Sequence, residues 1–261
     1  MIKNLALCGG GVNGYSILGA LDEMLKLGFL DNLENISGCS AGSLIAIGLA
    51  LGMEPGEIGD ILMELKPSSM EISNILVSNL QSLMNITPLK NILKKTLDKY
   101  PDIKTLEDIK IKYGKYVTIV GTNYETGEPI YFTPDTHPNT TILDCLIISS
   151  SVPIVFQPFV LDGIKYWDGG LTDPLPIKMF SKEETLGFWI EHDISISKNI
   201  VYRLVDTLIN RLYRLIPEGY TIIELPPSPL GFLDFSTDNK LEAYISGQNT
   251  IKKNIEVLEK I

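Results

Sequence analysis

The stretch Gly38-Cys39-Ser40-Ala41-Gly42 fits the pattern GxSxG, and the residues around it give that pattern a structural meaning. The segment before it, Leu33 to Ser37, is predicted to be a strand, and Ser43 to Leu51 is typical of a buried helix that ends at Gly52. On a sharp strand-to-helix turn the backbone angles are strained, and only small neighbours fit beside the central residue. The pattern therefore predicts a reactive serine at Ser40.

The helix that follows this turn favours a nucleophilic role for the serine. The first turn of a helix directs N–H groups and the positive end of the helix dipole toward negative charge that develops near Ser40. Cys39 is the alternative nucleophile within the same pattern. The elbow turns the side chain of this neighbour away from the reacting side, so we favour Ser40.

A second glycine-rich stretch lies nearer the amino terminus. Lys3 to Cys8 is typical of a buried parallel strand, Gly9-Gly10-Gly11-Val12-Asn13-Gly14 follows it, and Tyr15 to Leu27 has the apolar spacing of a helix. In this setting GxGxxG also fits a dinucleotide-binding loop, which needs an acidic residue at the end of the second strand, about 20 residues on. Asp31 and Glu34 lie before that strand or early in it. We therefore favour an oxyanion hole, in which consecutive glycine N–H groups lie beside the serine.

The rest of the sequence continues to alternate between strands and helices. Tyr116 to Thr122 and Glu128 to Phe132 have strand character, and so do residues 186–190 and 221–225. Helices are expected near residues 198–215 and from about Asn239 onward. We therefore expect one α/β domain over residues 1–261, with a mostly parallel central sheet in a three-layer α/β/α arrangement.

Residues 54–100 are expected to be helical throughout. Pro55 suits a first helical turn, Pro67 ends that helix, and Thr87-Pro88 resembles an N-cap followed by a first-turn proline. Met70 to Met84 is rich in Ile, Leu and Met and has few charges. We interpret this stretch as a helix packed in the core, and an apolar flap over the site is the alternative.

A serine hydroxyl needs a base to become nucleophilic. His137 lies in a turn-rich surface loop, and His192 follows a predicted strand without other marks of a site. Asp168 is the better candidate, because a hairpin with an Asp162-Gly163 turn leads directly to it. Two glycines come after this aspartate and allow another backbone to approach closely.

Three motifs in this order resemble the patatin-like phospholipase family: GGGxxG at 9–14, GxSxG at 38–42 and Asp-Gly-Gly at 168–170. Residues 117–128 resemble the central strand and hairpin of that family, and residues 149–158 resemble its Ser-x-x-x-Pro-x-x-Phe-x-Pro segment. The likeness runs from about residue 3 to 178, with a fainter echo at 233–236.

This resemblance implies that Ser40 is the nucleophile and that Asp168 is its base, without a histidine. The oxyanion-hole residues would be Gly9, Gly10 and Gly11, and the further motif glycines are Gly14, Gly38, Gly42, Gly169 and Gly170. The implied activity is phospholipase A-type hydrolysis of fatty-acyl esters through an acyl-enzyme, in peripheral contact with membranes or lipid aggregates. The dyad chemistry of this family needs no metal and no other cofactor, although some members respond to calcium or to protein activators.

One position departs from the family pattern. The family usually has Arg or Lys where this chain has Asn13, so a cation that could stabilise the oxyanion or a lipid phosphate is replaced by a neutral donor. Two alternatives therefore stay open on the same fold: a neutral-lipid or lysophospholipid esterase, and a lipid-binding pseudoenzyme. A dinucleotide-binding oxidoreductase is the third alternative, because the glycine loop also fits its motif.

The charge and composition of the chain limit which kinds of binding partner and which cellular compartment we expect for it. With 22 basic and 32 acidic residues the chain has a formal net charge of -10, which argues against nucleic-acid binding and against docking on anionic lipid through a polybasic patch. Any contact with a membrane is therefore expected to be made by apolar side chains. Three scattered cysteines, an apolar start too short for a signal peptide and no apolar run of about 20 residues predict a soluble cytoplasmic protein.

Overall fold

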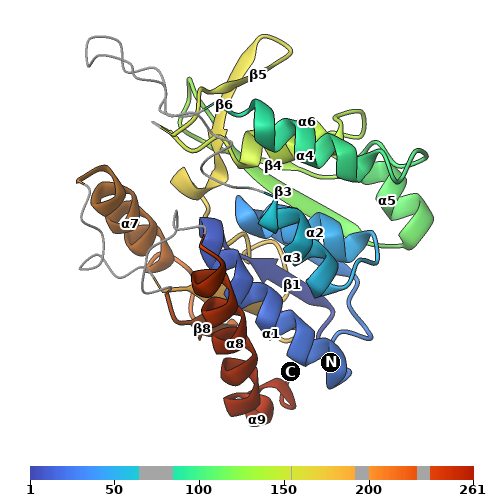
Figure 1. Ribbon diagram of the computed structural model, residues 1–261, viewed down its shortest axis with the longest axis vertical. Helices are drawn as coiled ribbons and strands as arrows, with labels where there is room; N and C mark the ends of the chain where they lie inside the picture. Colours follow the sequence, from blue (N-terminus) through green and yellow to red (C-terminus); the bar gives the residue numbers. More distant parts are fainter. Residues whose placement is uncertain (65–84, 154, 192–199, 228–235) are drawn as a thin grey trace.

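The computed structural model describes residues 1–261 except 65–84, 154, 192–199 and 228–235, and an eight-stranded sheet forms its centre (Figure 1). The strand order is β5-β6-β3-β2-β1-β7-β8, and β4 pairs with β3 beside this path. The parallel strands are β1 (Asn4–Leu7), β2 (Asn35–Cys39), β3 (Tyr116–Asn123), β7 (Thr185–Ile190) and β8 (Thr221–Leu225). The antiparallel strands are β4 (Pro129–Phe132), β5 (Phe159–Leu161) and β6 (Ile164–Asp168). The expected α/β fold with a mostly parallel sheet is confirmed.

The chain enters the sheet at β1 and extends it on both sides. From β1 it passes through α1 (Gly14–Lys26) to β2, continues through α2 (Ala41–Ala50) toward β3, and later returns to the other side of β1 as β7 and β8. The strand order therefore reverses beside β1. In open α/β sheets ligands bind at such a reversal, outside the carboxyl ends of the strands. The loops that follow β1 and β2 lie at this position, and they contain the glycine stretch and Ser40.

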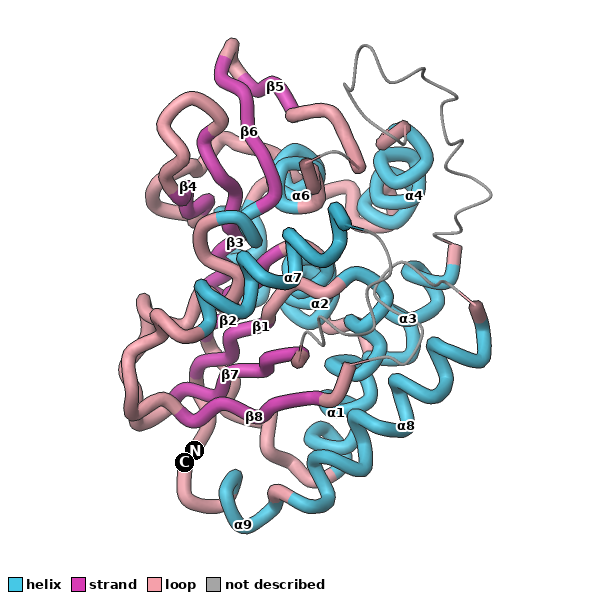
Figure 2. The backbone as a smooth tube through the Cα atoms, turned by 90° about the vertical axis from the view of Figure 1, so that its left-hand side faces the viewer, coloured by secondary structure: helices cyan, strands magenta, loops and turns pink. Residues whose placement is uncertain are grey.

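Helices pack against the sheet (Figure 2). Short 3-10 turns are η1 (Gly11–Asn13) and η3 (Gly169–Leu171), and the further α-helices are α3 (Pro55–Met63), α4 (Thr87–Leu97), α5 (Leu106–Tyr113), α6 (Ile142–Ser149), α7 (Ile200–Tyr213), α8 (Thr237–Lys253) and α9 (Ile255–Leu258). Helices α1, α2, α3 and α8 lie to one side of the strands. None of the helices in the described part of the chain has the length and apolar character that crossing a membrane requires.

Helices α1 and α8 approach each other closely enough for their backbones to touch. A Cβ atom on Gly247 of α8 would lie 1.9 Å from the carbonyl oxygen of Ser16, and one on Gly19 of α1 would lie 1.9 Å from the carbonyl oxygen of Tyr244. The two glycines therefore set the distance between the helices. Because α1 begins directly after the glycine stretch, this contact fixes the helix that leads out of the site.

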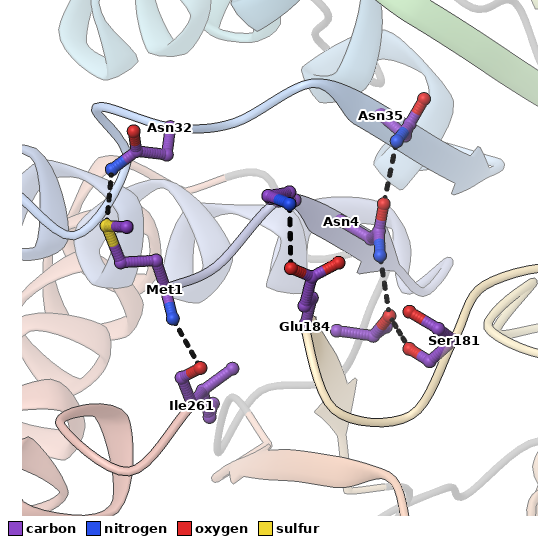
Figure 3. Close-up of polar contacts among 9 residues, drawn as sticks. Met1, Asn4, Asn32, Asn35, Ser181, Glu184 and Ile261 are labelled. Atoms are coloured by element: carbon purple, nitrogen blue, oxygen red, sulfur yellow. Dashed lines mark hydrogen bonds and ion pairs between the residues drawn. The ribbon is translucent and has the colours of Figure 1, made fainter.

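Asn4 links three neighbouring strands at the end of the sheet opposite to Ser40 (Figure 3). Its side-chain Nδ2 donates to Oγ1 of Thr185 at 3.0 Å, and its Oδ1 accepts from Nδ2 of Asn35 at 2.7 Å. The backbone ladder pairs the same three residues, Asn4 with Asn35 and Asn4 with Thr185. A buried amide that is bonded at both ends in this way stabilises one register of β1, β2 and β7.

Several elements differ from the sequence expectation by a few residues. Strand β2 runs over Asn35–Cys39 and not from Leu33, and α4 has Ile86 as its N-cap, so Thr87 is already helical. The predicted hairpin is confirmed, since Asp162 and Gly163 both have positive φ, 49° and 80°. The apolar stretch from Met70 to Met84 and the predicted helix end at Pro67 lie outside the described residues.

The α1–α8 contact gives a prediction about stability. Gly247→Ala is expected to lower the free energy of unfolding by about 3 kcal/mol or more, because the new methyl group forces two backbones apart. Gly56→Ala in α3 is the matched control. No atom lies within 4 Å of its Cβ position, so it should leave stability unchanged or raise it by about 0.5–1 kcal/mol. Urea denaturation of both variants measures the difference, and equal stabilities would contradict the close contact.

Candidate active site

Ser40 lies on a strained turn between β2 and α2. Its φ and ψ are 52° and -122°, and a non-glycine residue in such a conformation costs about 1–3 kcal/mol. Two glycines make the turn sterically allowed, because a Cβ on Gly38 would lie 2.4 Å from the carbonyl oxygen of Gly42, and one on Gly42 would lie 2.5 Å from that of Cys8. Both the N–H and the hydroxyl of Ser43 donate to the carbonyl oxygen of Ser40, at 2.9 and 2.6 Å. The elbow predicted from GxSxG is therefore present, and hydrogen bonds from Ser43 stabilise it.

The glycine stretch lies directly beside this serine. A Cβ atom on Gly9 would lie 3.0 Å from the Cβ of Ser40. Gly10 and Gly11 have positive φ, 154° and 56°, which favour glycine. The N–H of Gly9 donates to the carbonyl oxygen of Pro174 at 3.3 Å, whereas neither Gly10 nor Gly11 donates its N–H to another described residue. Of the three predicted oxyanion donors, Gly10 and Gly11 thus have N–H groups available in the described structure.

Asp168 ends β6, where its backbone pairs with Gly121 of β3. The residue is 4% exposed. Its Oδ1 accepts from the N–H of Gly170 at 2.7 Å and from the thiol of Cys39 at 3.7 Å, while Oδ2 is buried and accepts no hydrogen bond from a described residue. One oxygen of this carboxylate is therefore held by the protein, and the other is free to take a proton.

Burial raises the pKa of the Asp168 carboxyl from 3.8 to about 6. Donors at Gly170 and Cys39 and the adjacent Ser40 hydroxyl lower it again in part, so the Ser40 side chain lies next to this carboxylate. A base whose pKa is close to neutral removes a proton more effectively than an ordinary aspartate. The structure thus brings Ser40, Asp168 and the glycine stretch together at one edge of the sheet.

Cys39 takes part in the site as a hydrogen-bond donor. Its thiol is completely buried, and burial together with the nearby Asp168 charge raises its pKa well above the usual range. A thiol in such surroundings stays protonated and is not a nucleophile. Its Sγ points to Asp168, a contact that the GxSxG pattern alone did not predict.

A further layer of hydrogen bonds holds the aspartate in place. The hydroxyl of Thr122 donates to the carbonyl oxygen of Asp168 at 2.9 Å and contacts Oγ1 of Thr172 at 2.9 Å. A second buried carboxylate, Asp173, accepts from the hydroxyl of Tyr131 at 2.8 Å, and burial raises its pKa. Sequence reasoning missed these residues. Only their closeness to Asp168 in the chain could have indicated Thr172 and Asp173.

The remaining motif glycines allow close packing around the pair. A Cβ on Gly169 would lie 2.6 Å from the carbonyl oxygen of Val120, so η3 can pass directly over β3. A Cβ on Gly14 would lie 3.4 Å from the Cβ of Ala41, which is an ordinary contact between α1 and α2. On the other side of the elbow, the N–H of Ser40 donates to the hydroxyl of Ser149 at 2.9 Å.

The other residues considered from the sequence are His137, His192 and Asn13. His137 packs against Phe132, with ring centroids 4.6 Å apart, and its Nδ1 bonds to Thr136, while His192 is outside the described residues. Asn13 is buried at the end of η1, and its carbonyl oxygen accepts from the Ser16 hydroxyl at 2.7 Å. Within the described ranges no group of three or more His, Cys, Asp or Glu side chains is placed to hold a metal ion.

Comparison with known proteins identifies relatives of this chain. The family model for patatin-like phospholipases matches residues 5–181. The probable lipid hydrolase 463L of Invertebrate iridescent virus 6 is 30% identical over 193 residues, which are 69% of this chain and 63% of that protein. A cGAMP-activated phospholipase of Escherichia coli (strain TW11681) is 24% identical over 240 residues, which are 83% of this chain and 64% of that protein. This chain thus spans less than two thirds of the length of these curated relatives.

Solved structures share the fold at low sequence identity. The crystal structure of VipD from Legionella pneumophila superimposes with a TM-score of 0.68 at 18% identity, and the match covers 98% of this chain and 67% of that one. The fold similarity therefore extends beyond the residues that the family model matches.

Removing the buried charge of Asp168 is predicted to make the protein more stable, by an amount that depends on pH. Because the pKa in the folded protein is raised from 3.8 to about 6, the charge destabilises the fold as pH rises through this window, by up to about 3 kcal/mol at neutral pH. Asp168→Asn should therefore be more stable than the parent near neutral pH and equally stable below about pH 4. The exposed Asp102→Asn is the control, and denaturation at both pH values measures the effect. A gain in Asp168→Asn that does not depend on pH would contradict the raised pKa.

Proposed function

Because this chain belongs to the patatin-like phospholipase family, whose members are serine lipid acyl hydrolases, we propose that it cleaves fatty-acyl esters of phospholipids with Ser40 as nucleophile and Asp168 as base. The observation that carries the proposal is the buried Oδ2 of Asp168, which accepts no hydrogen bond from a described residue. The carboxylate of Asp168 lies beside the hydroxyl of Ser40, which is on a strained elbow. The adjacent glycine loop supports the same assignment, because its N–H groups are the donors that ester hydrolysis needs.

The first half of the reaction forms an acyl-enzyme. Oγ of Ser40 attacks the ester carbonyl carbon while Oδ2 of Asp168 takes the hydroxyl proton. The carbonyl oxygen becomes an oxyanion, which the N–H groups of Gly10 and Gly11 stabilise. The C–O bond to the alcohol then breaks, and the proton held by Asp168 passes to the departing alkoxide, which leaves as a lysolipid.

The second half repeats these steps with water. Asp168, now charged again, takes a proton from a water molecule that attacks the acyl carbonyl of the Ser40 ester. The tetrahedral intermediate collapses, the fatty acid leaves, and the proton returns to Oγ of Ser40. Burial favours this shuttle, because the pKa of about 6 lets Asp168 accept and release a proton near neutral pH.

The proposal also covers the class of substrate and the control of activity by an activator. Asn13 supplies no positive charge near the glycine loop, so a neutral-lipid or lysophospholipid ester is the second candidate substrate. The name of one relative states activation by cGAMP, and we include an activator of this chain, nucleotide or protein, among the proposed partners. A panel of phospholipid, lysophospholipid and triacylglycerol esters separates the substrate classes.

Labelling with a fluorophosphonate probe tests the dyad without assuming a substrate. The parent protein should react, Ser40→Ala should not react, and Asp168→Asn should react at least about 10^3-fold more slowly because the hydroxyl loses its base. The same order is expected for the hydrolysis of phospholipid vesicles.

Two exposed substitutions serve as matched controls for this experiment. Ser181→Ala and Asp102→Asn make the same chemical changes on the surface and should leave labelling unchanged. If Ser40→Ala reacts as fast as the parent protein, the nucleophile is wrong. If the folded parent does not react, with or without activators, the chain is a pseudoenzyme.

The pKa of Asp168 also predicts the pH dependence of hydrolysis. A base must be deprotonated to act, so kcat/KM should fall as pH drops through about 6. Cys39→Ala removes a donor that stabilises the charged carboxylate and should move this midpoint upward by about 0.5 unit. Cys39→Ser keeps a donor and should keep the midpoint at or below that of the parent. A midpoint that is the same in all three proteins would show that Cys39 does not act on Asp168.

A further inference from the structure

All the arginines of this chain lie in one short stretch. The sequence has three, Arg203, Arg211 and Arg214, and every other basic residue is a lysine. Residues 200–215 carry these three arginines and one aspartate, whereas the chain as a whole has a formal net charge of -10. The whole-chain charge, which argued against a basic docking patch, therefore hides a local concentration of positive charge.

The arginines are exposed on α7 and on the turn that continues it. The N–H of Arg214 donates to the carbonyl oxygen of Asn210, so the helical path extends past Tyr213. The spacing of the arginines places them on one side of the helix. Two leucines lie next to them along the same surface: Leu208 is 38% exposed and Leu215 is 61% exposed. In the part of the chain that the structure describes, the ion pairs are made by lysines, and none by the three arginines.

Helix α7 is fixed to the sheet close to the candidate active site. It packs against η3, the turn that directly follows Asp168 (Figures 1 and 2). At its carboxyl end the ring of Tyr213 stacks on Trp189 of β7, with centroids 4.2 Å apart, and its hydroxyl donates to Glu224 at 2.8 Å. The helix is thus held on one side while its arginines and leucines face outward.

We propose that this surface, Arg203, Leu208, Arg211, Arg214 and Leu215, docks the protein on a membrane that contains anionic phospholipid. The planar guanidinium group binds phosphate oxygens with two parallel hydrogen bonds, which an ammonium group cannot do. Exposed leucines beside basic groups are typical of helices that lie in the interface of a bilayer. The proposal rests on the proposed function, because docking next to η3 would bring the lipid ester to the edge where Ser40 lies.

Partition into vesicles tests this surface directly. Phosphatidylcholine vesicles with and without phosphatidylglycerol are mixed with the Ser40→Ala protein, which cannot degrade them, and the bound fraction is measured by sedimentation. The Arg203→Gln/Arg211→Gln/Arg214→Gln triple variant should bind anionic vesicles on the order of 100-fold more weakly at low salt, because each basic group contributes roughly fivefold. An Arg→Lys triple variant keeps the charge but loses the paired hydrogen bonds, and its binding should fall between that of the parent and that of the Gln variant.

A matched control removes the same charge elsewhere. Lys90, Lys94 and Lys99 are exposed on and after α4, and their triple change to Gln should leave the binding within about threefold of the parent. Equal loss in this control would overturn the proposal, because net charge and not α7 would then decide binding. Equal binding of the parent to neutral and anionic vesicles would also overturn it.

A soluble ester separates this inference from the proposed function. The arginine variant should hydrolyse p-nitrophenyl butyrate as fast as the parent does, and should lose hydrolysis of anionic vesicles in proportion to its lost binding. If no ester of either kind is cleaved, the proposed function fails while the vesicle binding of α7 is still measured. If the arginine variant binds as the parent does, the docking surface fails while the dyad stands.

Discussion

The contact between the start of α2 and the end of β1 is the constraint on which the site depends. Gly42 brings the first turn of α2 against the last carbonyl groups of β1, closer than any side chain would allow. This approach places the loop after β1 beside Ser40, so that N–H donors and a hydroxyl from two neighbouring strands face the same point. Paired strands keep them there, since Leu7 is in register with Gly38 and Cys8 bonds to Phe188 on the other side. The strained elbow therefore follows an inner strand of the sheet, which is paired on both sides.

The electrostatics of the pair follow from the way the aspartate is bonded. Gly170 and Cys39 both donate to Oδ1, and Thr122 holds the backbone carbonyl, so the carboxylate has one orientation. In the proposed dyad, which uses no histidine, the basicity of the carboxylate comes from its surroundings. Burial supplies it, because a charge that water does not stabilise binds a proton more strongly. The proposed dyad therefore depends on a carboxylate that is buried on one side and hydrogen-bonded on the other.

Sequence patterns predicted the elements that depend only on residues close together in the chain. The hairpin around Asp162-Gly163 and strand β8 occur where alternation and turn residues predicted them, and the elbow at Ser40 follows from its glycines. The strand order could not be predicted, because it depends on pairing between segments far apart in the chain. The hydrogen bond from the Gly9 N–H to the carbonyl oxygen of Pro174 could not be predicted for the same reason. These residues are 165 positions apart in sequence and meet only in the folded protein. The net charge of the chain does not show how its charges are distributed, because the arginines are confined to α7 and the turn after it while the acidic residues are spread over the chain.

The left-handed backbone of Ser40 and the buried charge of Asp168 have an evolutionary consequence. Both features lower the stability of the fold, so a chain that loses either residue becomes easier to fold. Mutational drift alone would therefore remove the pair early and leave the α/β framework intact. Variants without the strained serine or the buried carboxylate are therefore expected to stay well folded, so an intact fold alone does not reveal whether such a protein is active.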